Sequence, residues 1–254
     1  MRNKALISLI TAVYEDRFNL AGLIESVRNS KRNSVEWIVI DGGSADGTVD
    51  LLKDSRDVVD IFVSEPDNGI YEAWNKALKL CSGEKIVFLG ADDRISSDYF
   101  DIAIRACDSS VNILLFPTAY VNREVIIKVV NRHVWSKPLA FPVTLGFPHS
   151  GTIHSRALFI DGGFDASYRI AGDTEFLIRN SNKISIKLIA SDQPKVFYSL
   201  LGLSETVEKS VIYSELLRIY KKYKRKSIWF YIYILFLQAK LVIYYLKISK
   251  IPHN

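Results

Sequence analysis

Two adjacent carboxylates, Asp92 and Asp93, follow a short apolar run at residues 86–89. Carboxylate oxygens are hard ligands that suit Mg²⁺ or Mn²⁺, and such an ion takes further ligands from substrate phosphates and water. A metal held there would neutralise a diphosphate as it leaves a substrate. The alternative is an exposed turn in which Asp93 pairs with Arg94, an interaction that stabilises little.

A second candidate, Asp41, ends another apolar run and is followed by Gly42 and Gly43. Because glycine has no Cβ, the backbone there can approach a ligand closely. Asp41 could then accept hydrogen bonds from a nucleobase or a ribose. The alternative is a turn in which Asp46 or Thr48 caps the helix that comes next.

A third carboxylate, Asp173, stands just before a helical pattern at residues 176–179, with Glu175 close behind it. Acidic residues at a helix N-terminus interact favourably with the helix dipole. Taken alone, this segment therefore indicates a helix start and no more.

The elements that must position these side chains are short β-branched runs alternating with helical patterns between residues 5 and 108. This alternation is the signature of βαβ units and a mainly parallel, Rossmann-like sheet. We expect strands at residues 6–11, 37–40, 61–63 and 85–89, and helices at residues 18–30, 48–53 and 70–81.

A polar segment follows each expected strand. The carboxyl ends of parallel strands meet at one rim of an open α/β sheet, and ligands bind at that rim. We therefore expect four segments to share one site, at residues 14–16, 41–47, 65–69 and 90–93.

Beyond residue 109 the alternation loosens, with strand-like runs at residues 113–116 and 125–130 and a proline-punctuated loop at residues 137–148. We expect this half to supply the acceptor side of the cleft. No internal repeat or low-complexity linker is visible, so we expect one α/β domain at residues 1–204.

Six segments, in this order and spacing, resemble the family-2 nucleotide-sugar glycosyltransferases of the GT-A fold. Those inverting enzymes are common in bacterial polysaccharide, O-antigen and capsule biosynthesis. The most characteristic segments read WIVIDGGSADGT, SEPDNGIYEAWNK and GEKIVFLGADD. The resemblance covers residues 5 to about 204, with matches at residues 10–14, 37–48, 64–76, 83–93, 149–152 and 168–176.

The resemblance implies a donor site in which Tyr14 packs on the nucleotide base near Thr11 and Ala12, while Asp41 hydrogen-bonds the base. It further implies that Asp92 contacts ribose or phosphate. Three more residues are expected close to the donor, namely Asn75, Lys76 and Ala91.

For the reaction, the resemblance implies that Asp93 binds Mg²⁺ or Mn²⁺ and that Asp173 is the general base. The base would remove the proton of an acceptor hydroxyl as that oxygen attacks the anomeric carbon opposite the leaving diphosphate, which inverts the configuration. A base must reach its proton within hydrogen-bond distance, so Asp173 must face the cleft. His149 is a weaker candidate for the acceptor side, since a lone His is more often structural.

Two positions depart from the family pattern. Glu15 follows Tyr14 where many members have Asn, and Gly172 precedes Asp173 where many have a second carboxylate. These departures bear on the preferred donor more than on the reaction.

The expected function is transfer of a hexosyl or N-acetylhexosaminyl group from a nucleotide-diphosphate donor, most simply a UDP-sugar, to a lipid-linked or polysaccharide acceptor. One alternative is a nucleotidyltransferase, but no Gly-rich loop with a phosphate-clamping Arg or Lys stands near the N-terminus. The other is a catalytically silent sugar-binding or scaffold protein, against which the retained Asp41, Asp93 and Asp173 argue. Homo-oligomerisation stays open.

The charge of the chain is uneven. Residues 205–254 hold 10 Lys and Arg against 3 Asp and Glu, whereas residues 1–204 hold 23 against 25. A nucleic-acid binder would carry positive charge on its body, so we expect no nucleic-acid partner.

Two Cys in helical patterns suggest neither disulfides nor a thiolate metal site, and a reducing compartment fits them. Residues 5–13 are interpreted as a buried strand, since residues 14–17 offer no signal-peptide cleavage site.

The C-terminal tail at residues 205–254 combines helical spacing with positive charge. Five cations gather at residues 221–226, where they suit an anionic membrane surface. The apolar residues 228–246 are interrupted by Lys240, which lies on one stripe with Lys226, Tyr233 and Lys247, so we expect an interfacial helix more than a span. The alternative is a helix packed on the catalytic domain or on a second copy. We expect a cytoplasmic protein, peripheral on the inner face of the cell membrane.

Overall fold

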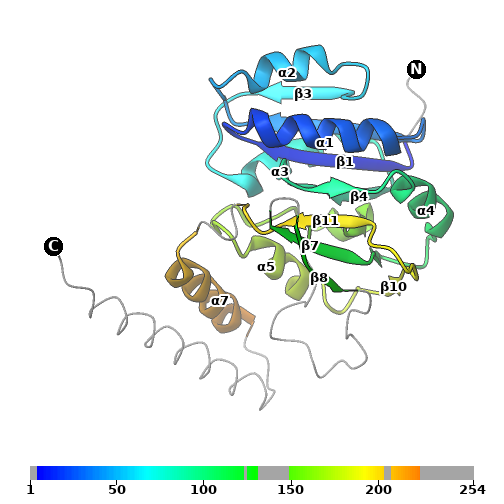
Figure 1. The fold of residues 1–254 in the computed structure, drawn as a ribbon. Helices are drawn as coiled ribbons and strands as arrows, with labels where there is room; N and C mark the ends of the chain where they lie inside the picture. The colour runs from blue at the N-terminus through cyan, green and yellow to red at the C-terminus, as the bar shows by residue number, and fades with distance from the viewer. Residues whose placement is uncertain (1–4, 123–124, 131–148, 203–206, 224–254) are drawn as a thin grey trace.

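The first half of the chain builds the parallel core of a seven-stranded sheet (Figure 1). The structure is a computed structural model that describes residues 5–122, 125–130, 149–202 and 207–223. Strand β1 lies between β2 and β4, β3 pairs with the far side of β2, and all three pairings are parallel. These strands are β1 (Ile7–Val13), β2 (Val35–Asp41), β3 (Ile61–Ser64) and β4 (Lys85–Phe88).

The second half completes this sheet beyond β4, in the order β10-β6-β9-β4. Strand β9 (Ile153–Ser155) is antiparallel to both β4 and β6 (Ile113–Leu115), whereas β10 (Ile186–Leu188) pairs parallel with β6. The expected α/β, GT-A-like class with a mainly parallel sheet is thereby confirmed.

A smaller sheet of four strands stands beside the large one, in the order β5-β11-β7-β8. Its strands are β5 (Arg94–Ile95), β7 (Thr118–Asn122), β8 (Val125–Val130) and β11 (Val196–Ser199). Because β5 starts directly after Asp93, its pairing with β11 brings Ser199 to the end of β4. The small sheet therefore places a late segment of the chain against the expected metal loop.

Helices cover both faces of the large sheet, because successive strand residues point to opposite sides. One hydrophobic cluster joins Leu9, Trp37 and Val87 to α1 (Arg17–Ser30), α2 (Thr48–Asp54) and α4 (Tyr99–Ala106). The other joins Ile10, Ile40 and Phe88 to α3 (Ile70–Leu80), α5 (Gly172–Arg179), α7 (Lys209–Tyr223) and the short helix η2 (Arg156–Phe159). The result is a three-layer arrangement with the sheet in the middle.

The helical spacing noted in the tail forms α7, which packs beside α5 (Figure 1). Leu216, Ile219 and Tyr220 are buried in the same cluster as the core of the sheet. No helix among the described residues is long and apolar enough to cross a membrane. The expected interfacial helix at residues 228–246 and the loop at residues 137–148 lie outside the described residues, and the boundary at residue 204 stays a prediction.

Candidate active site

A cleft of about 810 Å³ opens at the carboxyl ends of β1 to β4. The chain turns at the end of each of these four strands, and each turn contributes lining residues, as the sequence predicts. They are Ala12–Asp16 from the first turn, Gly42 and Gly43 from the second, Pro66, Asp67 and Gly69 from the third, and Gly90, Ala91 and Asp92 from the fourth. Asn19, Ile70, Ala73, Leu201 and Gly202 complete the lining.

A second pocket of about 160 Å³ adjoins the cleft and shares Asp92 with it. Asp173 lines this pocket from α5, and Tyr71 and Trp74 line it from α3. Its remaining lining includes Phe88, Asp93, His149, Ser150, Ile170, Tyr198 and Ser199. Asp92 and Asp173, 81 positions apart in the sequence, therefore face one space.

Asp93 is buried, with only 3% of its surface exposed. Its carboxylate accepts hydrogen bonds from the backbone N–H of Gly90 (2.8 Å) and of Ser199 (3.1 Å), and from the Ser150 hydroxyl. Burial raises the pKa of Asp93 to about 7, and the charge of Asp92 adds to that rise. The loop at Asp92 and Asp93 is therefore not an exposed turn, which was the alternative that the sequence left open.

Asp92 is half-buried between two glycines. A Cβ on Gly90 would lie 2.7 Å from its Oδ1, and one on Gly202 would lie 2.6 Å from its Oδ2. Burial raises the pKa of Asp92, against a hydrogen bond from Ser199 that lowers it. Of the two adjacent carboxylates, Asp92 is the one that reaches both cavities.

The side chain of Arg94 stabilises the loop that carries Asp92 and Asp93. Its guanidinium donates to the carbonyl oxygens of Ala91 (3.2 Å) and Asp93 (2.6 Å). It fits against α1 at Gly22, where a Cβ would lie 2.1 Å from Nη2 of Arg94. A glycine inside a helix costs stability, and here it provides the space for the guanidinium.

Asp41 is fully buried and does not line either cavity. Its carboxylate accepts four hydrogen bonds, from the N–H of Gly43 (3.1 Å), the N–H of Ser44 (3.0 Å), the Ser44 hydroxyl (2.5 Å) and the Ser64 hydroxyl (2.6 Å). Gly43 adopts a φ of +87°, which favours glycine. Asp41 therefore fixes the turn that places Gly42 and Gly43 in the cleft wall.

At the outer end of the cleft, Tyr14 is 66% exposed, and its ring lies against Gly42. Glu15 has a φ of 50°, and its N–H donates to the Ser44 hydroxyl (2.7 Å) while its carboxylate accepts from the N–H of Ala45 (2.8 Å). Thr11 is buried and accepts a hydrogen bond from the Trp37 indole (3.1 Å), so it lies below the cleft. Of the residues expected near the nucleotide base, Tyr14 and Ala12 line the cleft, whereas Thr11 and Asp41 do not.

Asn75 and Lys76 brace the site from outside the two cavities. The Asn75 amide pairs with both backbone groups of Phe164, at 2.8 Å each. Lys76 donates to the carbonyl of Pro66 (3.0 Å) and forms an ion pair with Glu65 (3.0 Å), which raises the pKa of Lys76. Lys76 thus steadies a loop of the cleft wall, and Asn75 ties α3 to the segment before α5.

Asp173 is half-buried in the first turn of α5. It accepts a hydrogen bond from the N–H of Thr174 (2.6 Å), and its Oδ1 lies 3.5 Å from the hydroxyl of Tyr71. Burial raises the pKa of Asp173 to about 6, although these hydrogen bonds oppose the rise. At neutral pH the group is therefore a carboxylate with raised basicity that faces a pocket.

His149 is 8% exposed and stacks on Trp74, with ring centroids 5.1 Å apart. Neither of its ring nitrogens has a hydrogen-bond partner among the described residues. Burial and the neighbouring His154 hold the pKa of His149 well below its usual range, so the ring is neutral. His149 lines the same pocket as Asp173, and its place on the acceptor side stays a prediction.

The large cleft is acidic. Four carboxylates, those of Glu15, Asp16, Asp67 and Asp92, line it, and none of its described lining residues is Lys, Arg or His. Within the part of the chain that the structure describes, no three His, Cys, Asp or Glu side chains gather into a metal site.

Sequence reasoning assigned no role in the site to Tyr71, Ser150 or Ser199, and it considered Arg94 only as an ion-pair partner of Asp93. Tyr71 lies on a largely apolar helix whose pattern predicts only core. Ser150 falls within the matched segment 149–152, but nothing there marks it as a donor to Asp93, 57 positions away. Ser199 reaches Asp93 from 106 positions away, and no local pattern marks it.

The α/β layers with a cleft at the strand ends form a GT-A, Rossmann-like fold. The chain belongs to glycosyl transferase family 2, whose family model matches residues 8–156. It is 27% identical over 235 residues to an uncharacterized glycosyltransferase of Mycobacterium tuberculosis, covering 89% of this chain and 87% of that protein.

Solved structures share the fold at low identity. TarS of S. aureus, as residues 1–349 in complex with UDP-GlcNAc, matches with a TM-score of 0.69 at 19% identity, over 84% of this chain and 65% of that one. In the longer TarS structure the match spans 39% of that chain. Mannosyltransferase PcManGT from Pyrobaculum calidifontis, in complex with GDP-Man and Mn²⁺, matches with a TM-score of 0.63 at 17% identity, over 94% of this chain and 70% of that one.

Proposed function

We propose that the protein is an inverting glycosyltransferase that moves a sugar from a nucleoside-diphosphate donor to a hydroxyl group of a lipid-linked or polysaccharide acceptor. The observation that carries this proposal is that Asp173 and Asp92 line one pocket at the inner end of the cleft. A single inverting displacement needs the base and the leaving diphosphate on opposite sides of the anomeric carbon, and Asp92 would hold the cation that binds the diphosphate.

The donor nucleotide would lie in the large cleft. Tyr14 offers an exposed aromatic face for the base, and Gly42 and Gly43 let the backbone come close to base or ribose. In this proposal Asp41, Asn75 and Lys76 position the walls of the cleft. The similar folds bind UDP-GlcNAc in TarS and GDP-Man in PcManGT; we favour a UDP-sugar here, with a hexosyl or N-acetylhexosaminyl group.

A divalent cation fits the acidic cleft. A diphosphate would enter a space lined by four carboxylates, and Asp92 and Asp93 crowd together with raised pKa values. We propose Asp92, rather than the sequence-predicted Asp93, as the ligand, since three protein donors already occupy Asp93. When bound, Mg²⁺ or Mn²⁺ would supply positive charge that stabilises the leaving diphosphate.

Asp173 would act as the general base. Its raised pKa makes it a better proton acceptor than an ordinary carboxylate while it remains charged at neutral pH. The acceptor oxygen forms the new bond to the anomeric carbon, the bond to the diphosphate oxygen breaks with its electron pair, and the hydroxyl proton passes to Asp173. His149, being neutral, would contribute shape to the acceptor side.

Membrane contact through the tail would bring the site to lipid-linked acceptors at the inner face of the cell membrane. The support is the cation cluster at residues 221–226 and the striped apolar segment after it. A chain ending after Tyr223 is the matched comparison, because it keeps α7. Flotation of the full chain, but not of the shortened one, with anionic vesicles would support the contact; equal flotation of both would end the idea.

The function itself is tested with a panel of nucleotide-sugars, measuring Mn²⁺-dependent binding and turnover for the parent, Asp92→Asn and Asp173→Asn. We expect Asp173→Asn to bind donor without transfer, and Asp92→Asn to need far more metal. Asp54→Asn is the matched control, because Asp54 is an exposed carboxylate at the end of α2 that lines neither cavity. If no donor bound, a silent scaffold would be the better assignment; transfer of a nucleotidyl group would favour a nucleotidyltransferase.

A further inference from the structure

Helix α7 carries Glu215, whose carboxylate holds the segment just before α5, the helix of the proposed base Asp173. Glu215 is 9% exposed and accepts hydrogen bonds from three successive N–H groups, those of Arg169 (2.5 Å), Ile170 (3.0 Å) and Ala171 (2.9 Å). Successive N–H groups that converge form a concave anion site, and here the anion comes from the protein itself. Because α5 begins at Gly172, Glu215 fixes the entry to the helix that carries Asp173.

The segment held by Glu215 also forms part of the pocket at Asp173. Ile170 lines that pocket, and its carbonyl oxygen accepts a hydrogen bond from the Tyr71 hydroxyl at 2.7 Å. The same hydroxyl lies 3.5 Å from Asp173 Oδ1. A continuous set of contacts therefore runs from Glu215 through Ile170 and Tyr71 to the proposed base.

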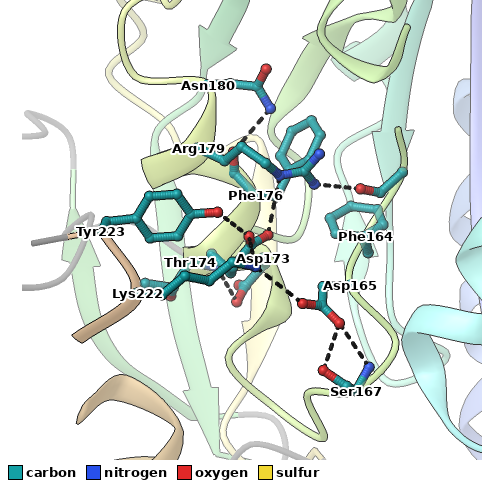
Figure 2. Close-up of polar contacts among 12 residues, drawn as sticks. Phe164, Asp165, Ser167, Asp173, Thr174, Phe176, Arg179, Asn180, Lys222 and Tyr223 are labelled. Carbon is teal, nitrogen blue, oxygen red and sulfur yellow. Dashed lines mark hydrogen bonds and ion pairs between the residues drawn. The ribbon is translucent and has the colours of Figure 1, made fainter. Parts of the chain in front are cut away.

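A second set of contacts joins the end of α7 to α5 (Figure 2). Glu175, fully buried one turn into α5, forms ion pairs with Lys222 (3.0 Å) and Arg179 (3.3 Å) and accepts a hydrogen bond from the Tyr223 hydroxyl. Lys222 also reaches Asp165, at 3.3 Å. Helix α7 therefore binds α5 at two places, at the residues just before its N-terminus and along its first turns.

We infer that Glu215 is a positioning residue for glycosyl transfer, so that α7 belongs to the catalytic unit rather than to a separate tail. The inference rests on the proposed role of Asp173 as the base. Positioning of this kind affects the transfer step more than donor binding, because residues 169–171, which Glu215 holds by their N–H groups, do not line the donor cleft.

The test is Glu215→Gln in the full chain, with steady-state kinetics at saturating Mn²⁺. Gln keeps the size of the side chain, but its NH₂ group would face N–H groups that need an acceptor, so the segment must shift. A misplacement of about 1 Å can cost on the order of 100-fold in rate, so we expect kcat to fall by about 10-fold to 100-fold with the donor KM within about twofold of the parent. Glu208→Gln is the matched control, since Glu208 is exposed at the start of the same helix.

Thermal unfolding of each variant separates positioning from loss of fold. A parental kcat for Glu215→Gln, or a fall in kcat no larger than the fall in folded protein, would overturn the inference. If Glu215→Gln does not fold, Glu215→Asp decides instead, since it keeps the charge but withdraws the carboxylate from the three N–H groups: a lower kcat at unchanged donor KM in folded protein supports the inference, and a parental kcat overturns it. Asp173→Asn is measured alongside, because transfer that survives its loss refutes the proposed function and not only the role of Glu215.

Discussion

The Tyr71 hydroxyl on α3 lies 3.5 Å from the Asp173 carboxylate on α5, although 102 positions separate them in the sequence. Burial raises the pKa of both groups, that of Asp173 to about 6 and that of Tyr71 well above its usual range. Tyr71 therefore stays protonated and donates its one hydrogen mainly to the Ile170 carbonyl at 2.7 Å, while Asp173 is charged at neutral pH. The pair places a neutral polar group beside the proposed base without adding charge to the pocket.

The activity should depend on pH through Asp173. Since the charged carboxylate is the proposed base and its pKa is about 6, kcat/KM at saturating Mn²⁺ should fall about tenfold per pH unit below that value. The other titratable groups lining the pocket are Asp92, Asp93, His149, Tyr71 and Tyr198. If kcat/KM fell only below about pH 4, near the ordinary pKa of an Asp side chain, the raised pKa assigned to Asp173 would be contradicted.

The stability of Asp173→Asn should exceed that of the parent at pH 8. A folded-state pKa raised above the unfolded value means that Asp173 stabilises the fold below about pH 4, and that this contribution is lost as the pH rises through about 6. For a half-buried group we expect a gain of about 1 to 2 kcal/mol in unfolding free energy at pH 8. Urea titrations at pH 8 and pH 4 check this, and a gain of equal size at both values would show that charge is not its cause.

Gly22→Ala should affect metal use more than stability. A methyl group at this helical position normally stabilises by about 0.5 to 1 kcal/mol, but here it would displace the Arg94 guanidinium from the carbonyls of Ala91 and Asp93. We expect a Tm near that of the parent and a several-fold rise in the Mn²⁺ concentration needed for half-maximal rate. Ala21→Ser, at the exposed neighbouring position, is the control. If Gly22→Ala needs no more Mn²⁺ than the parent, Arg94 does not support the metal-binding loop.

Truncation should separate the contribution of α7 from that of residues 224–254. A chain ending at Ser204 loses, among others, the three buried apolar side chains of α7, Leu216, Ile219 and Tyr220, each worth roughly 1.5 to 3 kcal/mol. That sum rivals the whole stability of a typical domain, roughly 5 to 15 kcal/mol. We expect this chain to be insoluble or to unfold without cooperativity, whereas one ending after Tyr223 should unfold cooperatively; like behaviour of both would contradict the packing of α7.

The sequence predicts the first half of the fold well, because strands and helices there alternate with clear periodicity. The four early strands, the rim they share and the acidic loop at Asp92 and Asp93 are confirmed. Short strands such as β9 and β11 have three or four residues, too few for a periodic signal.

The detailed site escapes prediction for a related reason. Whether a carboxylate faces a ligand or supports a loop depends on donors far away in the chain, as Ser199 shows for Asp93 and Ser64 for Asp41. Glu215 likewise reads as one charge on a helical tail until its three backbone partners are known. Local pattern finds the acidic loops, and tertiary contacts assign their roles.

The central claim is a single displacement with Asp173 as the base, and proton NMR of the early product tests it most directly. With the nucleotide-sugar that the parent turns over, the new glycosidic bond should have the anomeric configuration opposite to that of the donor, and Asp173→Asn should form no product. A first-formed product that retains the donor configuration, or one that accumulates at the parental rate in Asp173→Asn, would contradict the claim.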